Sequence, residues 1–185
     1  MPDYYTKVTE VPPQILAGLD DRLGTAGQRR MTTMATNPNE EPGGCEIVSS
    51  RVFAAPRDLV FEAFSNPDHL VHWWGPKGFT NTFSEFDLRP GGAWRFVMHG
   101  PDGVDYQIAK DFVEVVKPER IVLQHLSLVH RFRMTMTFAE HFGKTELTWR
   151  MVFESAAEAA KLKSFLTEAN EQNFDRLREY LATLS

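Results

Sequence analysis

The stretch RVFAAPRDLVFEAFSNPDHLVHWWGPKGF, residues 51–79, decides the fold. Its beginning continues the alternating pattern of EIVSSRVFA, residues 46–54, which is typical of a strand. Pro56 then opens a helix, and the apolar side chains of LVFEAF, residues 59–64, give that helix one broad apolar face. The sequence Ser65-Asn66-Pro67 ends it with a cap-like residue and starts a second short helix, residues 68–73. One strand followed by two short helices is predicted.

Six further strands are predicted after this stretch, with no helix between them. Turn sequences rich in glycine and proline, such as RPGG at 89–92 and GPDG at 100–103, separate the first of these strands. The predicted strands are residues 79–88, 93–99, 106–116, 120–126, 130–140 and 145–153. Because parallel strands would need long crossover connections, the sheet is expected to be antiparallel.

The end of the chain, residues 156–184, contains no proline or glycine and is predicted to form one long amphipathic helix. Its apolar stripe consists of Phe165, Leu166, Ala169, Phe174, Leu177, Leu181 and Leu184. A curved antiparallel sheet must bury one face, and this helix is expected to cover it. The predicted class is α+β, with a curved antiparallel sheet wrapped around the last helix and two short helices after the first strand. A sheet wrapped round a helix tends to leave a cavity between them, and such a cavity is a separate expectation.

Residues 1–44 differ in composition from the rest and predict a flexible N-terminal extension before a single domain at 45–185. They hold five of the 11 prolines and end in the turn-rich run NPNEEPGG. Ile15, Leu16 and Leu19 have the spacing of one short amphipathic helix that would dock on the domain or on a partner.

Composition excludes several kinds of partner. The net charge is -5 and the basic residues are scattered, so no nucleic-acid partner is expected. No apolar run approaches the roughly 20 residues needed to cross a bilayer, so no membrane partner is expected either. Cys45 is the only cysteine, which excludes an internal disulfide and favours the cytoplasm. No glycine-rich phosphate loop of the ATP or NAD type occurs, and no cofactor is expected.

Period-2 alternation places large side chains on the inner faces of the central strands. The expected lining of the cavity is Trp73, Trp74, Trp94, Phe96, Met98, Tyr106, His125, Phe132, Met134, Met136, Trp149, Met151, Phe165 and Phe174. Methionine and aromatic side chains suit varied apolar ligands, because thioether chains repack easily and rings offer broad contact area. A tightly packed core with no room for a ligand is the alternative.

No catalytic set is readable in the sequence. The weak candidates are His125, which shares a strand face with apolar neighbours, and Asp111 as its carboxylate partner in acid–base chemistry. His69 and His72 lie three residues apart beside Asp68, but no glutamate base accompanies them and no metal site is expected. The strand arginines that alternate with the apolar set are expected on the outer face of the sheet: Arg95, Arg131, Arg133 and Arg150.

From Arg51 onward the chain resembles the activator-of-heat-shock-ATPase-like branch of the START-like (SRPBCC) superfamily. The resemblance covers roughly residues 46–184 and rests on five blocks in order: RVFAAPRDLVFEAFSNPDHLVHWWGPKGF, DLRPGGAWRFVMHGPDG, VEVVKPERIV, TELTWRMVF and NFDRLREYLATL. It implies the helix-grip (START/Bet v-like) fold. Trp73-Trp74 would plug the mouth between the short helices and the sheet, and Gly91-Gly92 would allow a turn that side chains hinder.

The chain departs from this family pattern at two places. Many relatives carry a glycine in the strand where this chain has AKDF, residues 109–112, and a Gly-Trp pair in the last helix where it has QNF, residues 172–174. Both departures are expected to alter the wall of the cavity. The family's motifs specify the fold more than a reaction.

Three functions follow from the resemblance and the residues together. The leading one is binding of a small apolar or amphipathic ligand between sheet and terminal helix. The second is a co-chaperone-like role in which the outer sheet face and the extension contact a chaperone or another protein. The third is a cyclase, hydratase or hydrolase that uses the same cavity, with His125 and Asp111 as acid or base. A stress-response role is also compatible with the family.

Overall fold

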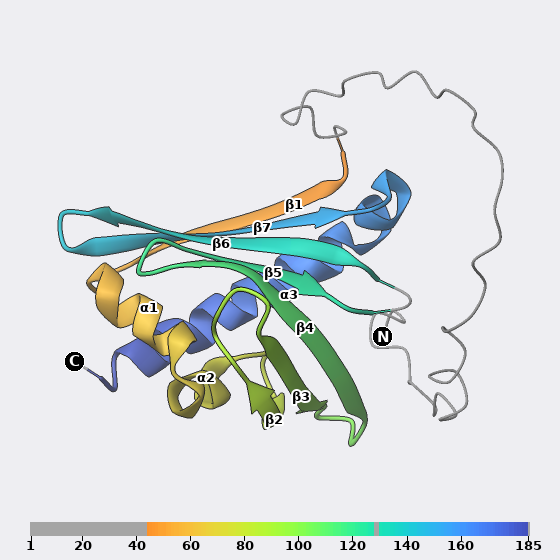
Figure 1. Ribbon diagram of the computed structural model, residues 1–185, viewed down its shortest axis with the longest axis horizontal. Helices are drawn as coiled ribbons and strands as arrows, with labels where there is room; N and C mark the ends of the chain where they lie inside the picture. The colour runs from red at the N-terminus through yellow and green to blue at the C-terminus, as the bar shows by residue number, and fades with distance from the viewer. Residues whose placement is uncertain (1–43, 128–129, 185) are drawn as a thin grey trace, which may run out of the picture.

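The computed structural model describes residues 44–127 and 130–184. They form one seven-stranded antiparallel sheet, in the order β1-β7-β6-β5-β4-β3-β2, with two short helices after β1 and a long helix at the C-terminal end (Figure 1). The predicted fold class is therefore confirmed. The predicted extension and its short helix lie outside the described residues, apart from Gly44.

The elements follow one another in the predicted order. Their bounds are β1 Glu46–Phe53, α1 Arg57–Ser65, α2 Pro67–Trp73, β2 Thr80–Phe86, β3 Ala93–His99, β4 Asp105–Val116, β5 Arg120–His125, β6 Phe132–His141, β7 Lys144–Phe153 and α3 Ala156–Leu181. The last helix is shorter than predicted, and Leu184 lies exposed beyond its end.

Capping side chains define where α2 and α3 begin. The side chain of Asn66 accepts a hydrogen bond from the backbone N–H of Asp68 at 3.0 Å, and Pro67 occupies the first turn of α2. Ser155 accepts from the backbone N–H of Glu158 at 3.4 Å at the start of α3. Such caps satisfy backbone donors that have no partner within the helix.

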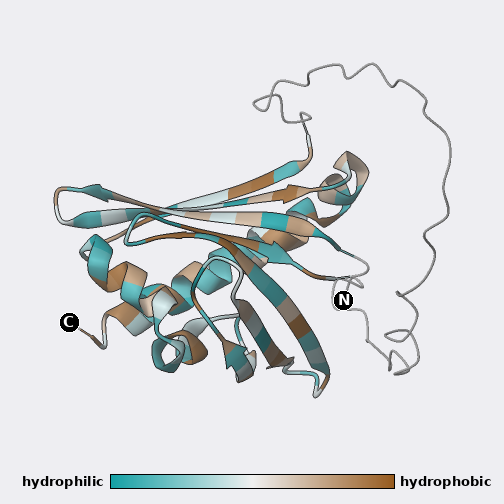
Figure 2. Cartoon of the chain, in the orientation of Figure 1, coloured by the Kyte–Doolittle hydropathy of each residue, from teal (hydrophilic) through white to brown (hydrophobic). Residues whose placement is uncertain are grey.

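The long helix α3 crosses one face of the curved sheet, and α1 and α2 lie beside its C-terminal half (Figure 1). None of the helices in the described residues lies on the other face of the sheet. Along the strands, apolar and polar residues alternate, as the bands in Figure 2 show on β3 and β4. The apolar members face α3, so the core lies between the sheet and the helices.

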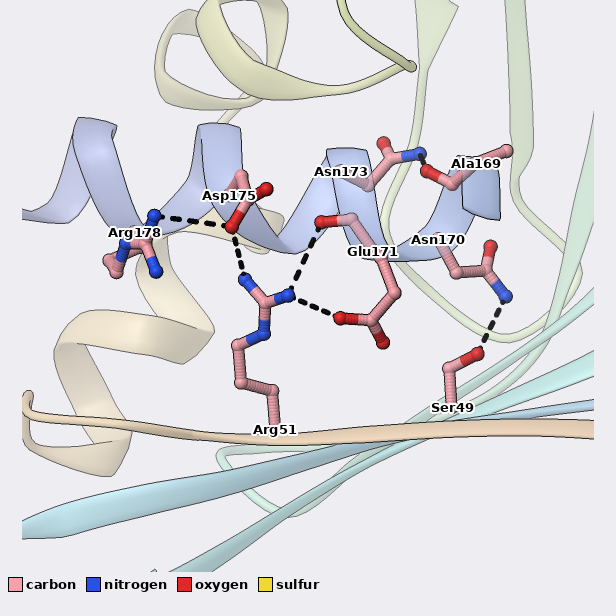
Figure 3. Close-up of polar contacts among 8 residues, drawn as sticks. All are labelled: Ser49, Arg51, Ala169, Asn170, Glu171, Asn173, Asp175 and Arg178. Atoms are coloured by element: carbon pink, nitrogen blue, oxygen red, sulfur yellow. Dashed lines mark hydrogen bonds and ion pairs between the residues drawn. The ribbon is translucent and has the colours of Figure 1, made fainter. Parts of the chain in front are cut away.

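Polar contacts fasten α3 to the edge strand β1 (Figure 3). The Arg51 guanidinium is paired with Glu171 and, at 2.7 Å from Oδ1, with Asp175, and it lies 5.5 Å from the centre of the Phe174 ring. One turn earlier, the buried Asn170 donates to the Ser49 hydroxyl at 3.2 Å. These contacts fix the position of α3 along the sheet as well as its distance from it.

A second group of contacts joins α3 to the end of α2. The backbone N–H of Gly75 donates to Asn173 Oδ1 at 2.7 Å, and Arg176 Nη1 donates to the carbonyl oxygens of Gly75 and Pro76 at 2.8 and 3.1 Å. Arg176 Nη2 also donates to the His72 carbonyl at 3.1 Å. The last carbonyls of a helix have no intrahelical partner, and Arg176 supplies a donor to one of them, the carbonyl of His72 in α2.

Gly91 and Gly92 allow the connection between β2 and β3 to approach β4. Gly91 N–H donates to the Phe112 carbonyl at 2.8 Å, and Phe112 N–H donates to the Gly92 carbonyl at 2.9 Å. A Cβ on Gly92 would lie 2.0 Å from the Asp87 carbonyl oxygen, whereas a Cβ on Gly91 would meet nothing within 4 Å. Only Gly92 is therefore required by close packing, and Gly91 by its positive φ of 80°.

We predict that Gly92→Ala lowers the free energy of unfolding by about 2–3 kcal/mol, because the added methyl group overlaps backbone that must shift. Gly91→Ala is the matched control and should cost only about 1 kcal/mol, the strain of a left-handed alanine. Urea denaturation of both variants measures the difference. Equal losses for the two variants would contradict the assignment.

Candidate functional site

The predicted lining residues lie on the inner side of the sheet and on the helices that cover it. All are buried except Tyr106 and Phe165, which are half-buried. Their burial agrees with the alternation of the strands, while their contact with a ligand stays a prediction. Leu166, Ala169, Leu177 and Leu181 of the predicted helical stripe are also buried.

Trp74, directly after α2, lies at the centre of an aromatic cluster. Its ring centroid is 4.9 Å from that of Trp94 on β3, 5.3 Å from that of Trp149 on β7 and 5.5 Å from that of Trp73. Trp73 donates its indole N–H to the Ala63 carbonyl at 2.9 Å. The indole nitrogens of Trp94 and Trp149 are buried without a hydrogen-bond partner among the described residues.

Lys110 on β4 extends into the same cluster. Only 6% of its surface is exposed, and its Nζ lies 4.3 Å from the ring centroid of Trp74, 4.5 Å from that of Trp94 and 5.5 Å from that of Phe96. No ion pair or hydrogen bond connects this amine to any residue of the described ranges. Burial in apolar surroundings disfavours the charged amine and lowers the pKa of Lys110 to about 7.

His125 on β5 is the cross-strand neighbour of Lys110. Its ring stacks on Phe132, with ring centroids 4.7 Å apart, and its Nδ1 is buried without a partner among the described residues. Burial, with smaller contributions from the positive charges of Lys110 and His130, lowers the pKa of His125 to about 3. The imidazole is therefore neutral at physiological pH. His130 lies nearby and pairs with Glu158 at the start of α3, Nδ1 to Oε1 at 2.6 Å.

The structure does not bring Asp111 and His125 together. In the β4–β5 register His125 is opposite Lys110, and Asp111 is opposite Gln124. Asp111 is directed to the outer face, where its carboxylate pairs with Arg95 at 2.6 Å. The acid–base pair suggested by the sequence is thus not formed, because adjacent residues of a strand point to opposite faces.

His69 and His72 contact Tyr180 of α3. His69 Nδ1 lies 2.6 Å from the Tyr180 hydroxyl, and the His72 ring stacks on the Tyr180 ring at 5.6 Å. Within residues 44–127 and 130–184, no group of three or more His, Cys, Asp or Glu side chains has an arrangement that could hold a metal ion. The two histidines therefore help to hold α2 against α3.

Sequence reasoning missed Lys110 as a member of the interior. The signal was present, because Lys110 has the same strand parity as Ile108 and Phe112, whose side chains face the core. It also lies in AKDF, residues 109–112, where the chain departs from the pattern of its family. A lysine on the apolar face of a central strand is rare unless it is paired.

The curved antiparallel sheet around a long terminal helix defines a START-like, or SRPBCC, domain. Residues 54–182 match the family described as activator of Hsp90 ATPase homolog 1-like protein. The chain belongs to this family. No curated protein matches its sequence.

Solved structures from several bacteria share the fold. A protein from Nitrosomonas europaea superposes with a TM-score of 0.71 at 19% identity, over 80% of this chain and 100% of its own. One from Mycobacterium smegmatis gives 0.70 at 23%, over 81% and 99%. The AHSA1 protein from Silicibacter pomeroyi gives 0.64 at 18%, over 76% and 99%. Among the helices described, none has the length and apolar character needed to cross a membrane.

The lowered pKa of Lys110 predicts a stability that depends on pH. The folded chain releases this proton near pH 7, whereas the unfolded chain holds it up to about pH 10.5. Between these values the unfolded state binds more protons, so the free energy of unfolding should rise with pH, by up to about 1.4 kcal/mol per unit. Lys110→Met should abolish this rise and stabilise the protein most at pH 6 to 7.

Thermal or urea denaturation at several pH values between 6 and 9 measures the effect. Lys161→Met, which changes an exposed lysine of α3, is the control and should leave the rise unchanged. Parallel pH curves for the wild type and Lys110→Met would show that the amine is not desolvated in the folded protein.

Proposed function

We propose that this protein binds a small apolar or amphipathic molecule between the sheet and α3. The observation that carries the proposal is a set of buried polar atoms near Trp74 and along the adjoining strands that have no partner in the described residues, namely Trp94 Nε1, Trp149 Nε1, His125 Nδ1 and Asn81 Oδ1. Beside them lies the buried amine of Lys110, over the rings of Trp74 and Trp94. Buried polar groups in proteins are nearly always hydrogen-bonded. A bound molecule would supply the missing partners.

The remaining wall of the interior suits the apolar part of such a molecule. Met134, Met136 and Met151 lie on the inner faces of β6 and β7, near Trp149 and Phe174, whose ring centroids are 4.7 Å apart. Methionine side chains adapt to irregular shapes, and aromatic rings offer large apolar surfaces. The half-buried Phe165 of α3 would cover the molecule from the helix side.

A protein-interaction role is the second candidate, supported by the family description and by apolar side chains on the surface. Phe142 is fully exposed at the turn between β6 and β7, and Val48 and Val52 are exposed on the edge strand β1. Exposed apolar groups of this kind mark protein contacts when they gather in one patch. Binding to a chaperone would use these exposed residues but would not explain why Lys110 is buried. We therefore rank this role second.

An enzymatic role that uses His125 and Asp111 is not proposed, because Asp111 lies on the outer face with Arg95. For the compartment, we propose the cytoplasm, where a single free and buried cysteine such as Cys45 is in keeping with reducing conditions.

Binding of 1-decanol tests the leading proposal. We expect saturable binding with a stoichiometry of one in native mass spectra, and a change in tryptophan fluorescence, because all four tryptophans lie in the interior. Phe165→Ala should weaken binding roughly tenfold, since it removes an apolar contact. Phe142→Ala removes the same side chain from an exposed site and should have no effect. Fluorescence that changes linearly, without saturation, would argue against an interior site.

The second candidate predicts a different result. A pull-down from the lysate of the producing cells would recover a heat-shock ATPase with the wild-type chain and lose it with Phe142→Ser. If the ATPase is recovered equally by the wild type and by Phe142→Ser, the exposed hairpin is not the contact surface.

A further inference from the structure

We propose that the ligand of the interior is a hydrophobic carboxylic acid, whose carboxylate is bound by Lys110 beside the rings of Trp74, Trp94 and Phe96. This inference rests on the proposed function and specifies the chemical class of the ligand. It depends on three features of the site, namely the kind of polar groups left unpaired, the number of charges near them and the apolar wall that surrounds them.

The unpaired groups are chiefly hydrogen-bond donors. A lysine ammonium has three N–H groups and no acceptor, and an indole nitrogen is a donor only. Lys110 and Trp94 both contact Trp74, and Trp149 contacts the same ring at a centroid distance of 5.3 Å. Such a set is complementary to a ligand with acceptor oxygens. A carboxylate offers two oxygens with several lone pairs, more than an alcohol or a ketone of the same size.

The charge balance favours an anion at this place. Isolated burial of an ammonium group is costly unless it is paired, and no carboxylate among the described residues is paired with Lys110. Of the nearby acids, Asp111 is bound to Arg95 on the outer face and Glu158 is bound to His130. The three rings attract the ammonium but carry no net charge, so they lower its cost without neutralising it.

The same balance points to a single negative charge. His125, directly across from Lys110, is neutral at physiological pH because its pKa is lowered to about 3. Arg176 donates to the carbonyl oxygens at the end of α2, and Arg51 is paired with Glu171 and Asp175. One amine therefore faces the ligand, and a dianion such as a phosphate monoester would carry excess charge into an apolar interior. A monocarboxylate with an apolar body matches the site.

Binding of a carboxylate should take up a proton above pH 7. The groups that face Lys110 are aromatic on β3 and at the end of α2, and on β5 the only titratable neighbour in the register is the neutral His125, with His130 and its partner Glu158 beyond it. With its pKa lowered to about 7, Lys110 changes its charge between pH 7 and 9. Because a bound anion favours the ammonium form, affinity for it should fall as pH rises above about 7.

Decanoate and 1-decanol form a matched pair of ligands for the test, since they share a chain length and differ in the head group. Isothermal titration should show that the wild type binds decanoate at least tenfold more tightly than 1-decanol at pH 6.5. This preference should shrink several-fold between pH 7 and pH 8.5, while binding of 1-decanol stays constant. Titrations in two buffers of different ionisation enthalpy should reveal proton uptake with decanoate only.

Lys110→Met should keep the cooperative thermal unfolding of the wild type, which shows that the variant is folded, and should lose at least tenfold in affinity for decanoate and less in affinity for 1-decanol. Lys161→Met should behave as the wild type. If the wild type binds both ligands equally and Lys110→Met changes neither, the carboxylate inference is overturned while interior binding of apolar molecules stands. If neither ligand binds saturably, the proposed function fails and the inference fails with it.

Discussion

The contacts that hold α3 against the sheet determine how the side chains between the helix and the sheet are placed. Several of its polar contacts lie in the middle of the helix: Asn170 with Ser49, Asn173 with Gly75, and Arg176 with the carbonyls of His72 and Gly75. Apolar packing alone is non-directional, whereas these bonds define the position of the helix along the sheet. They also fix the end of α2, and thereby the Trp74 ring that follows it. The aromatic cluster is a consequence of this junction.

The burial of Lys110 is not explained by apolar packing. A methionine or leucine would fill the same space among Trp74, Trp94 and Phe96 without the cost of burying an amine. Hydrogen-bond donors of Trp94 and Trp149 are left without described partners in the same region. A protein that places several unsatisfied donors in an apolar interior loses stability, and a ligand that pairs with them restores it. On the proposed function, these donors serve binding rather than stability.

Much of the fold was predictable, because its signals are local. Pro56 and Asn66 lie at the beginnings of helices, and period-2 alternation identified the inner faces of β3, β6 and β7. The polar contacts between α3 and β1 were not predictable. Asn170 and Ser49, for example, are 121 residues apart in sequence, and only folding brings them together. The predicted pairing of His125 with Asp111 is wrong by one residue. In the register of β4 and β5, Lys110 lies opposite His125 in place of Asp111. Lys110 itself was overlooked because a charge on an apolar strand face contradicts the pattern by which interior residues are recognised.

The most direct test of this account is the mass spectrum of the native protein, purified gently from the cells that produce it, beside that of a denatured aliquot. The account predicts a mass excess of one small molecule per chain, released on denaturation and identified as an apolar compound with a carboxylate. A chain that carries no such molecule under gentle conditions, and that takes up none when incubated with a lipid extract of the same cells, would contradict it.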